Sequence, residues 1–196
     1  MSVNGEDPLA IVEAELNEAT DRARRMIEAC DPRRFTVRPD PARWSAAECI
    51  AHLSVSSEMV LPVLREALEH GKRSGITGGR PPSMDLLGRV LRWFLEPPVR
   101  SRLKTAAPFV PRSVRAKAES LAEFSAFQSK LIEALKSARG LDLGKLKVVS
   151  PFDKRMKFNL YSAFRIVAAH ERRHLWQAEQ AIEALAKMHS PWPRTD

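Results

Sequence analysis

Hydrophobic residues recur at alternating steps of four and three along much of the chain, which is the pattern of an amphipathic helix. The pattern first appears over residues 8–30, where Asp7 and Pro8 occupy the positions of a cap and a first turn. A second helix is predicted to begin directly after Ser45, because Ser45 and Glu48 have the spacing of a capping box. The first third of the chain therefore predicts two long helices.

The second half of the chain predicts two more long helices. One spans residues 113–138, where Gln128 interrupts the apolar strip. The other runs from Asn159, a suitable cap, to about Lys187. Between them, residues 140–158 contain glycines, a proline and a β-branched pair, and we interpret this segment as an extended loop rather than as part of a sheet.

The connections between these helices differ in length. Residues 31–44 are rich in proline and charge and predict a loop. The crossover between the second and third helices, residues 71–112, is much longer and contains a short amphipathic pattern over residues 84–96 that could cover one end of the core. Four long helices with one long connection predict an all-α, four-helix bundle, in which sites are built from side chains on facing helices.

Composition bounds the organisation of the protein. A chain of 196 residues with 44% hydrophobic content predicts a single domain over residues 1–196, which includes a tail at 188–196. Neither a membrane span nor a secretory signal is visible, so we expect a cytoplasmic protein. Cys30 and Cys49 lack CxxC spacing and are expected to be thiols, as in a reducing compartment.

The net charge of +8 is concentrated in residues 89–117, which hold eight basic residues and one acid. Such a patch could attract phosphate, anionic lipid or an acidic substrate. In one interpretation Arg100 and Arg102 clamp an anionic thiol or carboxylate. In another, residues 84–104 contact an anionic membrane. We expect no specific nucleic-acid binding, because no recognition helix or stacking sheet accompanies the charge.

Three histidines are the main candidates for chemistry. His170 and His174 are four residues apart and therefore share one helix face, and His52 flanks the apolar strip of another helix. A single buried histidine usually satisfies its hydrogen bonds locally, but three that point inward can share one metal ion. Such a site keeps coordination positions for water or substrate. We expect His70 and His189 to lie on the surface.

Several residues near these histidines have two interpretations. Glu171 and Gln177 could orient an imidazole or a water molecule, although we favour a solvent-exposed Glu171. Cys49 could be an extra ligand or a redox-sensitive thiol, but we expect a small buried apolar side chain. Trp44 is expected to pack as a staple before the helix cap, and Gln128 is a candidate polar group facing the cavity. We assign no catalytic residue from the sequence.

Two motifs resemble those of the DinB and YfiT-like superfamily of metal-dependent bacterial proteins. They are W-S-x-x-E-x-x-x-H-L at residues 44–53 and H-E-x-x-H-L-x-Q at residues 170–177. The resemblance implies a four-helix bundle in up-down-down-up order, often a homodimer. It also implies a divalent metal ion such as nickel, zinc or iron, held by His52, His170 and His174.

The same resemblance suggests a function. Characterised relatives include transferases and isomerases that use low-molecular-weight thiols such as bacillithiol or mycothiol. We therefore expect a metal-dependent enzyme that acts on a small-molecule substrate, as a thiol S-transferase or isomerase, with hydrolysis following the same chemical logic. Alternatives are a non-catalytic metal or small-ligand binding protein of stress responses, and a surface-binding module that uses the basic crossover.

Overall fold

The computed structural model describes residues 7–98 and 105–188, and in this part of the chain the fold is mostly helical with one small sheet. The all-α prediction is confirmed at that level. The long helices are α1 (Pro8–Ala29), α3 (Ala46–Arg73), α5 (Lys117–Ser137) and α6 (Leu160–Met188). The shorter elements are α2 (Pro32–Phe35), α4 (Leu86–Leu95), η1 (Ala107–Phe109), β1 (Lys147–Val149) and β2 (Lys157–Asn159).

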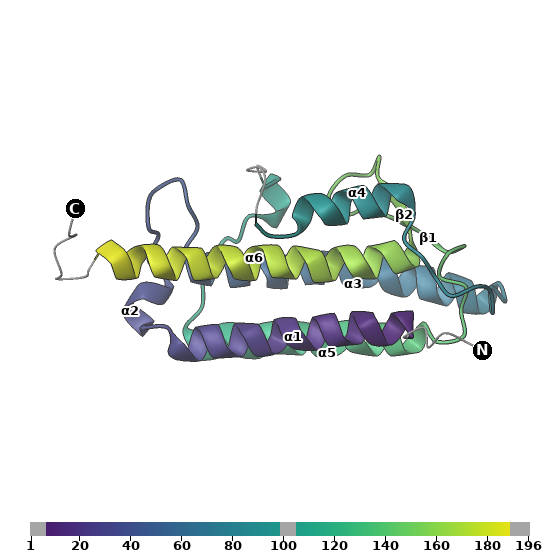
Figure 1. The fold of residues 1–196 in the computed structure, drawn as a ribbon, viewed down its shortest axis with the longest axis horizontal. Helices are drawn as coiled ribbons and strands as arrows, with labels where there is room; N and C mark the ends of the chain where they lie inside the picture. Colours follow the sequence, from purple (N-terminus) through teal and green to yellow (C-terminus); the bar gives the residue numbers. More distant parts are fainter. Residues whose placement is uncertain (1–6, 99–104, 189–196) are drawn as a thin grey trace, which may run out of the picture.

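The four long helices lie side by side along the long axis of the molecule (Figure 1). Helices α1 and α6 run in one direction and α3 and α5 in the other, and each of α3 and α1 contacts both α5 and α6. The core between them contains Leu16, Leu64, Leu131 and Phe164 at one end and Phe124 with its neighbours at the other. Burial of these apolar faces is what holds the helices together.

The predicted starts of three helices are confirmed by their caps. Asp7 accepts a hydrogen bond from the amide of Leu9, and Ser45 and Glu48 form the full capping box. Asn159 accepts a hydrogen bond from the amide of Ser162 at 2.7 Å. Helix α5 begins at residue 117 instead of 113, after Ala116, which has no capping side chain to mark the start in the sequence.

The interpretation of residues 140–158 as a loop was wrong, because β1 in this segment and β2, which ends at Asn159 directly before α6, form an antiparallel hairpin. β1 pairs with β2 in a register that sets Val148 opposite Phe158. Both of these side chains are buried, whereas Val149 is 42% exposed. Strands this short depend on tertiary packing, so the local sequence carried little signal. The short helix α2, capped by Asp31, also lies inside the loop predicted for residues 31–44.

Helix α3 is long and apolar enough to cross a membrane by length and composition, but 61% of its most apolar window is buried inside the fold. Its apolar side packs against α5 and α6. The composition of α3 is therefore that of a core helix.

Helix α4 confirms the short amphipathic helix of the crossover and packs on α6 (Figure 1). Asp85 fixes its start: its carboxylate accepts hydrogen bonds from the amides of Gly88 at 2.9 Å and Asn159 at 2.6 Å. A Cβ atom at Gly88 would lie 2.5 Å from the Cβ of Ser162, so a glycine allows this close approach. The opposite face of α4 leaves Leu86, Val90 and Trp93 exposed.

An ion-pair network also joins α4 to its neighbours. Glu96 binds Arg172 of α6 at 2.5 Å and Arg92 at 3.2 Å, and Arg92 lies 3.5 Å from Glu15 of α1. Part of the basic charge of the crossover is thus neutralised within the fold. Burial alone would raise the pKa of the Glu96 carboxyl, but the hydrogen bond and charge of Arg172, with the charges of Arg92 and Arg165, hold that pKa below its usual value.

We predict that Glu96→Gln lowers the free energy of unfolding by about 1 kcal/mol at neutral pH. Because the folded-state pKa of Glu96 is depressed, its contribution is present above the unfolded-state pKa, about 4.3, and is lost as the pH falls through the folded-state value. Urea unfolding at pH 7 and at decreasing pH measures this difference, which shrinks in acid. Glu69→Gln is the control, because its pair with Lys72 is exposed. A difference that stays constant in acid would contradict the assignment.

Candidate metal centre

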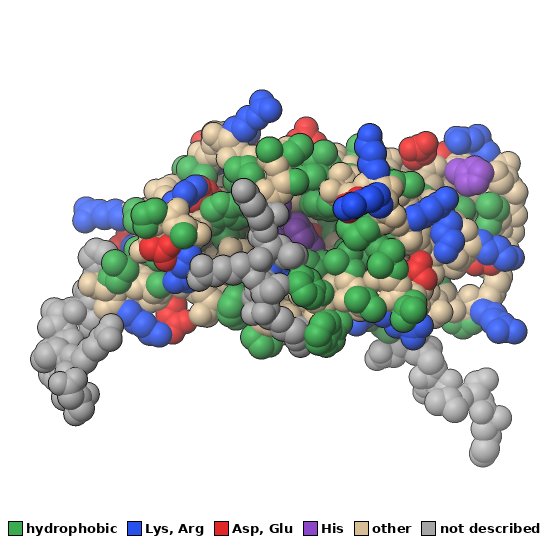
Figure 2. Space-filling model, turned by 90° about the horizontal axis from the view of Figure 1, so that it is seen from above, with side chains coloured by type: hydrophobic (Ala, Val, Ile, Leu, Met, Phe, Trp, Pro, Cys, Tyr) green, Lys and Arg blue, Asp and Glu red, His purple; other side chains and the backbone are tan. Residues whose placement is uncertain are grey.

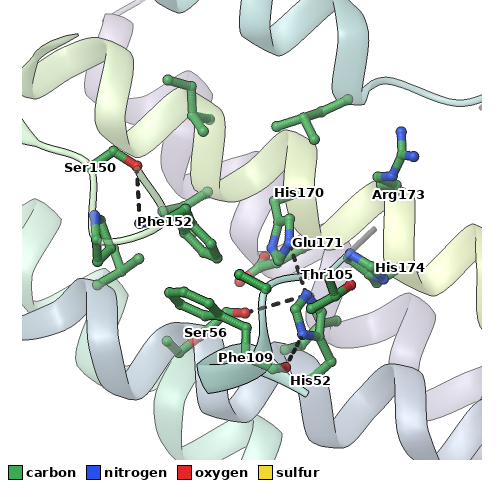
Figure 3. Close-up of a pocket in the computed structure, with 18 of the residues that line it drawn as sticks. His52, Ser56, Thr105, Phe109, Ser150, Phe152, His170, Glu171, Arg173 and His174 are labelled. Carbon is green, nitrogen blue, oxygen red and sulfur yellow. Dashed lines mark hydrogen bonds between the residues drawn. The ribbon is translucent and has the colours of Figure 1, made fainter. Parts of the chain in front are cut away.

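Three histidines from two neighbouring helices meet at one point. His52 comes from α3, and His170 and His174 come from successive turns of α6, with one ring nitrogen of each lying within 4.8 Å of the others (Figure 3). His52 and His174 are buried, and His170 is partly exposed. The structure therefore brings together the three residues that the sequence predicted as metal ligands.

The backbone of the crossover fixes the tautomer of His52. Its Nδ1 lies 2.7 Å from the carbonyl oxygen of Phe109 in η1, and because a carbonyl only accepts, Nδ1 must donate. The lone pair is then on Nε2, which lies 3.2 Å from Nε2 of His170. The Ser56 hydroxyl lies 3.5 Å from the same nitrogen (Figure 3). A carbonyl that holds the far nitrogen of a ligand is the usual outer-shell arrangement at metal sites.

These distances fit a metal ion with nitrogen ligands. Two imidazole nitrogens at 2.0–2.1 Å from one tetrahedral ion are about 3.3 Å apart, and the Nε2 atoms of His52 and His170 are separated by 3.2 Å. Nδ1 of His174 is buried with no hydrogen-bond partner among the described residues. A buried polar atom of this kind is costly unless something binds it. The residues present therefore fit a divalent ion, and imidazole suits zinc, nickel and iron alike.

The surroundings keep the three imidazoles neutral. Burial lowers the pKa of His52, although the hydrogen bond to Phe109 acts in the opposite sense. Burial, with the charges of His52 and Arg173, lowers the pKa of His170 to about 3. The pKa of His174 is also well below its usual value, mainly through burial. Metal binding requires neutral imidazole, and the fold supplies it.

The histidines form part of the wall of a cavity of about 1120 Å³. Viewed from above, a histidine side chain is visible at the bottom of a hollow between hydrophobic side chains (Figure 2). The Trp44 ring, expected as a staple, lies 5.1 Å from the ring of His52 and lines the cavity. The rings of Phe109 and Phe152 stack with their centroids 4.1 Å apart, and the centroid of the Phe152 ring lies 5.6 Å from that of His170. Aromatic side chains therefore surround the site on several sides.

Glu171 is buried, and the expectation that it faces solvent was wrong. Gln128 donates to its carboxylate at 3.1 Å and to the carbonyl oxygen of Leu16, also at 3.1 Å. Burial raises the pKa of Glu171 to about 8, although the Gln128 hydrogen bond and the charge of Arg172 oppose the shift. Because α6 contacts α1, α3 and α4, more of its circumference is buried than one apolar strip suggests.

The two amide side chains take different places. Gln128 is buried but does not line the cavity; it lies behind the site, where it holds Glu171. Gln177 lines the same cavity as His174, and its orienting role stays a prediction.

The sequence missed contacts that come from distant segments. No local pattern marks the Phe109 carbonyl or the Phe152 ring as neighbours of the histidines. Ser56 could have been found, because it follows His52 by one helical turn. The arginines proposed as an anion clamp, Arg100 and Arg102, lie outside the described residues.

His70 has no part in the site. His70 is exposed at the end of α3, as expected, and His189 lies outside the described residues.

Both cysteines are buried thiols, and neither lines the cavity. Burial raises the pKa of Cys30 and, to a greater extent, of Cys49. We predict that both react with dithiobis-nitrobenzoate at least about 10-fold more slowly in the folded protein than in urea, because the thiolate is the reactive form. Absorbance of the released thionitrobenzoate measures the rate. The Cys49→Ala variant reports the rate of Cys30 alone, and the difference from the unmodified protein gives the rate of Cys49. Rapid labelling of Cys49 in the folded protein would restore the ligand or redox interpretation.

Comparison with known proteins gives one finding. The family model described as the DinB superfamily matches residues 15–178, a range that contains His52, His170 and His174. Searches of curated proteins and of solved structures gave no match. Because the family match covers most of the chain, the protein belongs to the DinB superfamily.

Proposed function

We propose that this protein is a metal-dependent enzyme that uses a small-molecule thiol, as an S-transferase or isomerase. In this proposal His52, His170 and His174 hold a divalent ion, with nickel, zinc and iron as the candidates. The observation that carries the proposal is the convergence of three neutral nitrogen donors within 4.8 Å on the wall of a large cavity. A site built only to brace a fold has four protein ligands and no need for such a cavity.

The residues of the chain divide the work at this site. A divalent ion bound by neutral imidazoles retains its charge and lowers the pKa of a thiol or water beside it, which supplies a nucleophile near neutral pH. The Phe109 carbonyl keeps His52 in the ligating tautomer. Trp44 and the stacked Phe109 and Phe152 rings limit the access of water. The nearby Ser56 hydroxyl can donate to or accept from a bound substrate.

We further propose that the four long helices form a bundle in up-down-down-up order, which their directions in Figure 1 support. A homodimer in the cytoplasm completes the proposal. The homodimer rests on the resemblance described above, and the cytoplasm rests on the expectations from the sequence. The exposed apolar side chains of α4 offer a surface for a second protein or, through residues 84–104, for a membrane. Size-exclusion chromatography with light scattering tests the dimer.

The metal site has a direct test. Protein purified without a histidine tag is predicted to contain about one divalent ion per chain by plasma mass spectrometry, because three imidazoles provide one site. His52→Ala and His174→Ala each remove one of the three imidazole ligands and should abolish binding. His70→Ala is the control, since this histidine is exposed and outside the site. Absence of metal after incubation with nickel, zinc and iron would refute the proposal.

Turnover separates an enzyme from a binding protein with the same site. We predict that the metal-loaded protein accelerates the reaction of bacillithiol or mycothiol with a general electrophile such as chlorodinitrobenzene. His174→Ala should reduce kcat/KM by at least about 100-fold, because loss of an electrostatic catalyst costs that much or more. Stoichiometric metal with no turnover across thiols would instead favour the non-catalytic binding protein.

A further inference from the structure

We infer that the substrate of this site carries an unbranched apolar chain, which lies along one arm of the cavity while its polar end lies at the histidines. The placement of the substrate's polar end at the histidines rests on the proposed function. It names a substrate class, an amphiphile with an aliphatic chain, from the shape and lining of the cavity.

The cavity follows two antiparallel helices away from the metal centre. On α3 its lining continues beyond His52 through two serines, Ser56 and Ser57, and then through apolar side chains to Leu64. The stretch from His52 to Val60 spans about 12 Å, at 1.5 Å per residue.

The α6 side of the cavity matches this stretch. Helix α6 runs in the opposite direction, so its lining residues before His170, namely Val167 and Ala163, lie along the same stretch. This stretch is long enough to hold a chain of several methylene groups.

The other walls of this stretch are also apolar. Helix α4 contributes Leu91 and Leu95, and the hairpin contributes Val148 and Phe158. Together with Val60, Leu64, Ala163 and Val167 of α3 and α6, these four residues line a part of the cavity that we call the apolar arm. A region bounded by aliphatic and aromatic side chains offers water few hydrogen bonds and favours apolar groups.

The polar side chains at the hairpin end of the cavity are already engaged. Asp153 forms an ion pair with Arg155 at 2.7 Å, and Ser150 accepts a hydrogen bond from the amide of Phe152 at 3.2 Å. Neither needs a ligand, so neither argues for a polar group in the apolar arm.

The opposite end of the cavity has a different lining. Beyond the histidines it is lined by Arg43, Trp44, Gln177 and Gln180. The acidic side chains of the lining are Asp153, between the two strands, and Glu171, beside the histidines on α6. The cavity therefore changes from apolar to polar across the metal centre. This contrast sets the direction of the substrate, with the chain in the apolar arm and any charged part at the polar end of the cavity. Arg43 at that end already pairs with Asp40 at 3.8 Å and donates to the carbonyl oxygen of Gln180 at 3.4 Å.

Binding of straight-chain alcohols to the metal-free protein tests the apolar arm alone. Binding of fatty acids of the same chain lengths to the metal-loaded protein tests the arm together with a carboxylate that can bind the metal. We expect the affinity of the metal-free protein to rise about 4-fold per methylene from butanol to octanol, as burial of each methylene predicts. Val167→Phe and Leu91→Trp fill the arm from two different elements and should reduce the gain to less than about 2-fold per methylene. Ile132→Phe is the control, a partly buried site on α5 outside the cavity.

Calorimetric titration measures the affinities, thermal unfolding confirms that each variant folds, and metal content is measured on the same samples. An affinity that does not depend on chain length, or a gain that survives in both filled variants, overturns the inference. If metal binds but chain length has no effect, the inference fails and the proposed metal function stands. If no metal binds but the chain-length dependence follows the variants as expected, the apolar arm stands and the metal function fails.

Discussion

The packing of α3 against α6 is the constraint on which the site depends. Each helix buries an apolar face, and the contact between them places His52 against His170 and His174 in a region from which water is largely excluded. The Nε2 atoms of His52 and His170 face each other at 3.2 Å. Burial of several imidazoles with few partners is unfavourable, so the surrounding apolar core must hold them in place.

Part of that cost lies beside the histidines, and other buried polar atoms without a partner among the described residues lie on Glu15, Arg92 and Arg165. Near the histidines the interior also holds Glu171 and Gln128, and each of these side chains has a buried oxygen with no hydrogen-bond partner among the described residues. The other end of the interior, around Leu64 and Leu131, contains a large cluster of buried apolar side chains. Proteins commonly concentrate unfavourable polar burial at functional sites and offset it with stability elsewhere.

The crossover is more than a connection, because it supplies two walls of the site. Its helix α4 is fixed to α6 by the hydrogen bond that Ser162 donates to Asp85 and by the ion pair of Glu96 with Arg172. Its segment η1 brings the Phe109 carbonyl to His52. The hairpin then meets η1 through the stack of Phe152 on Phe109. Segments between the long helices therefore shape the cavity, while the helices carry the ligands.

The sequence by itself determined the features that depend on neighbours within one or two helical turns. Apolar periodicity predicted the long helices, cap residues such as Ser45 and Asn159 marked their starts, and the four-residue spacing of His170 and His174 put both on one face. The tertiary structure alone decided the burial of Glu171, the pairing of Val148 with Phe158 and the contact of Phe109 with His52. These features join residues far apart in the chain, and their energies come from packing and exclusion of water, which exist only once the helices have assembled.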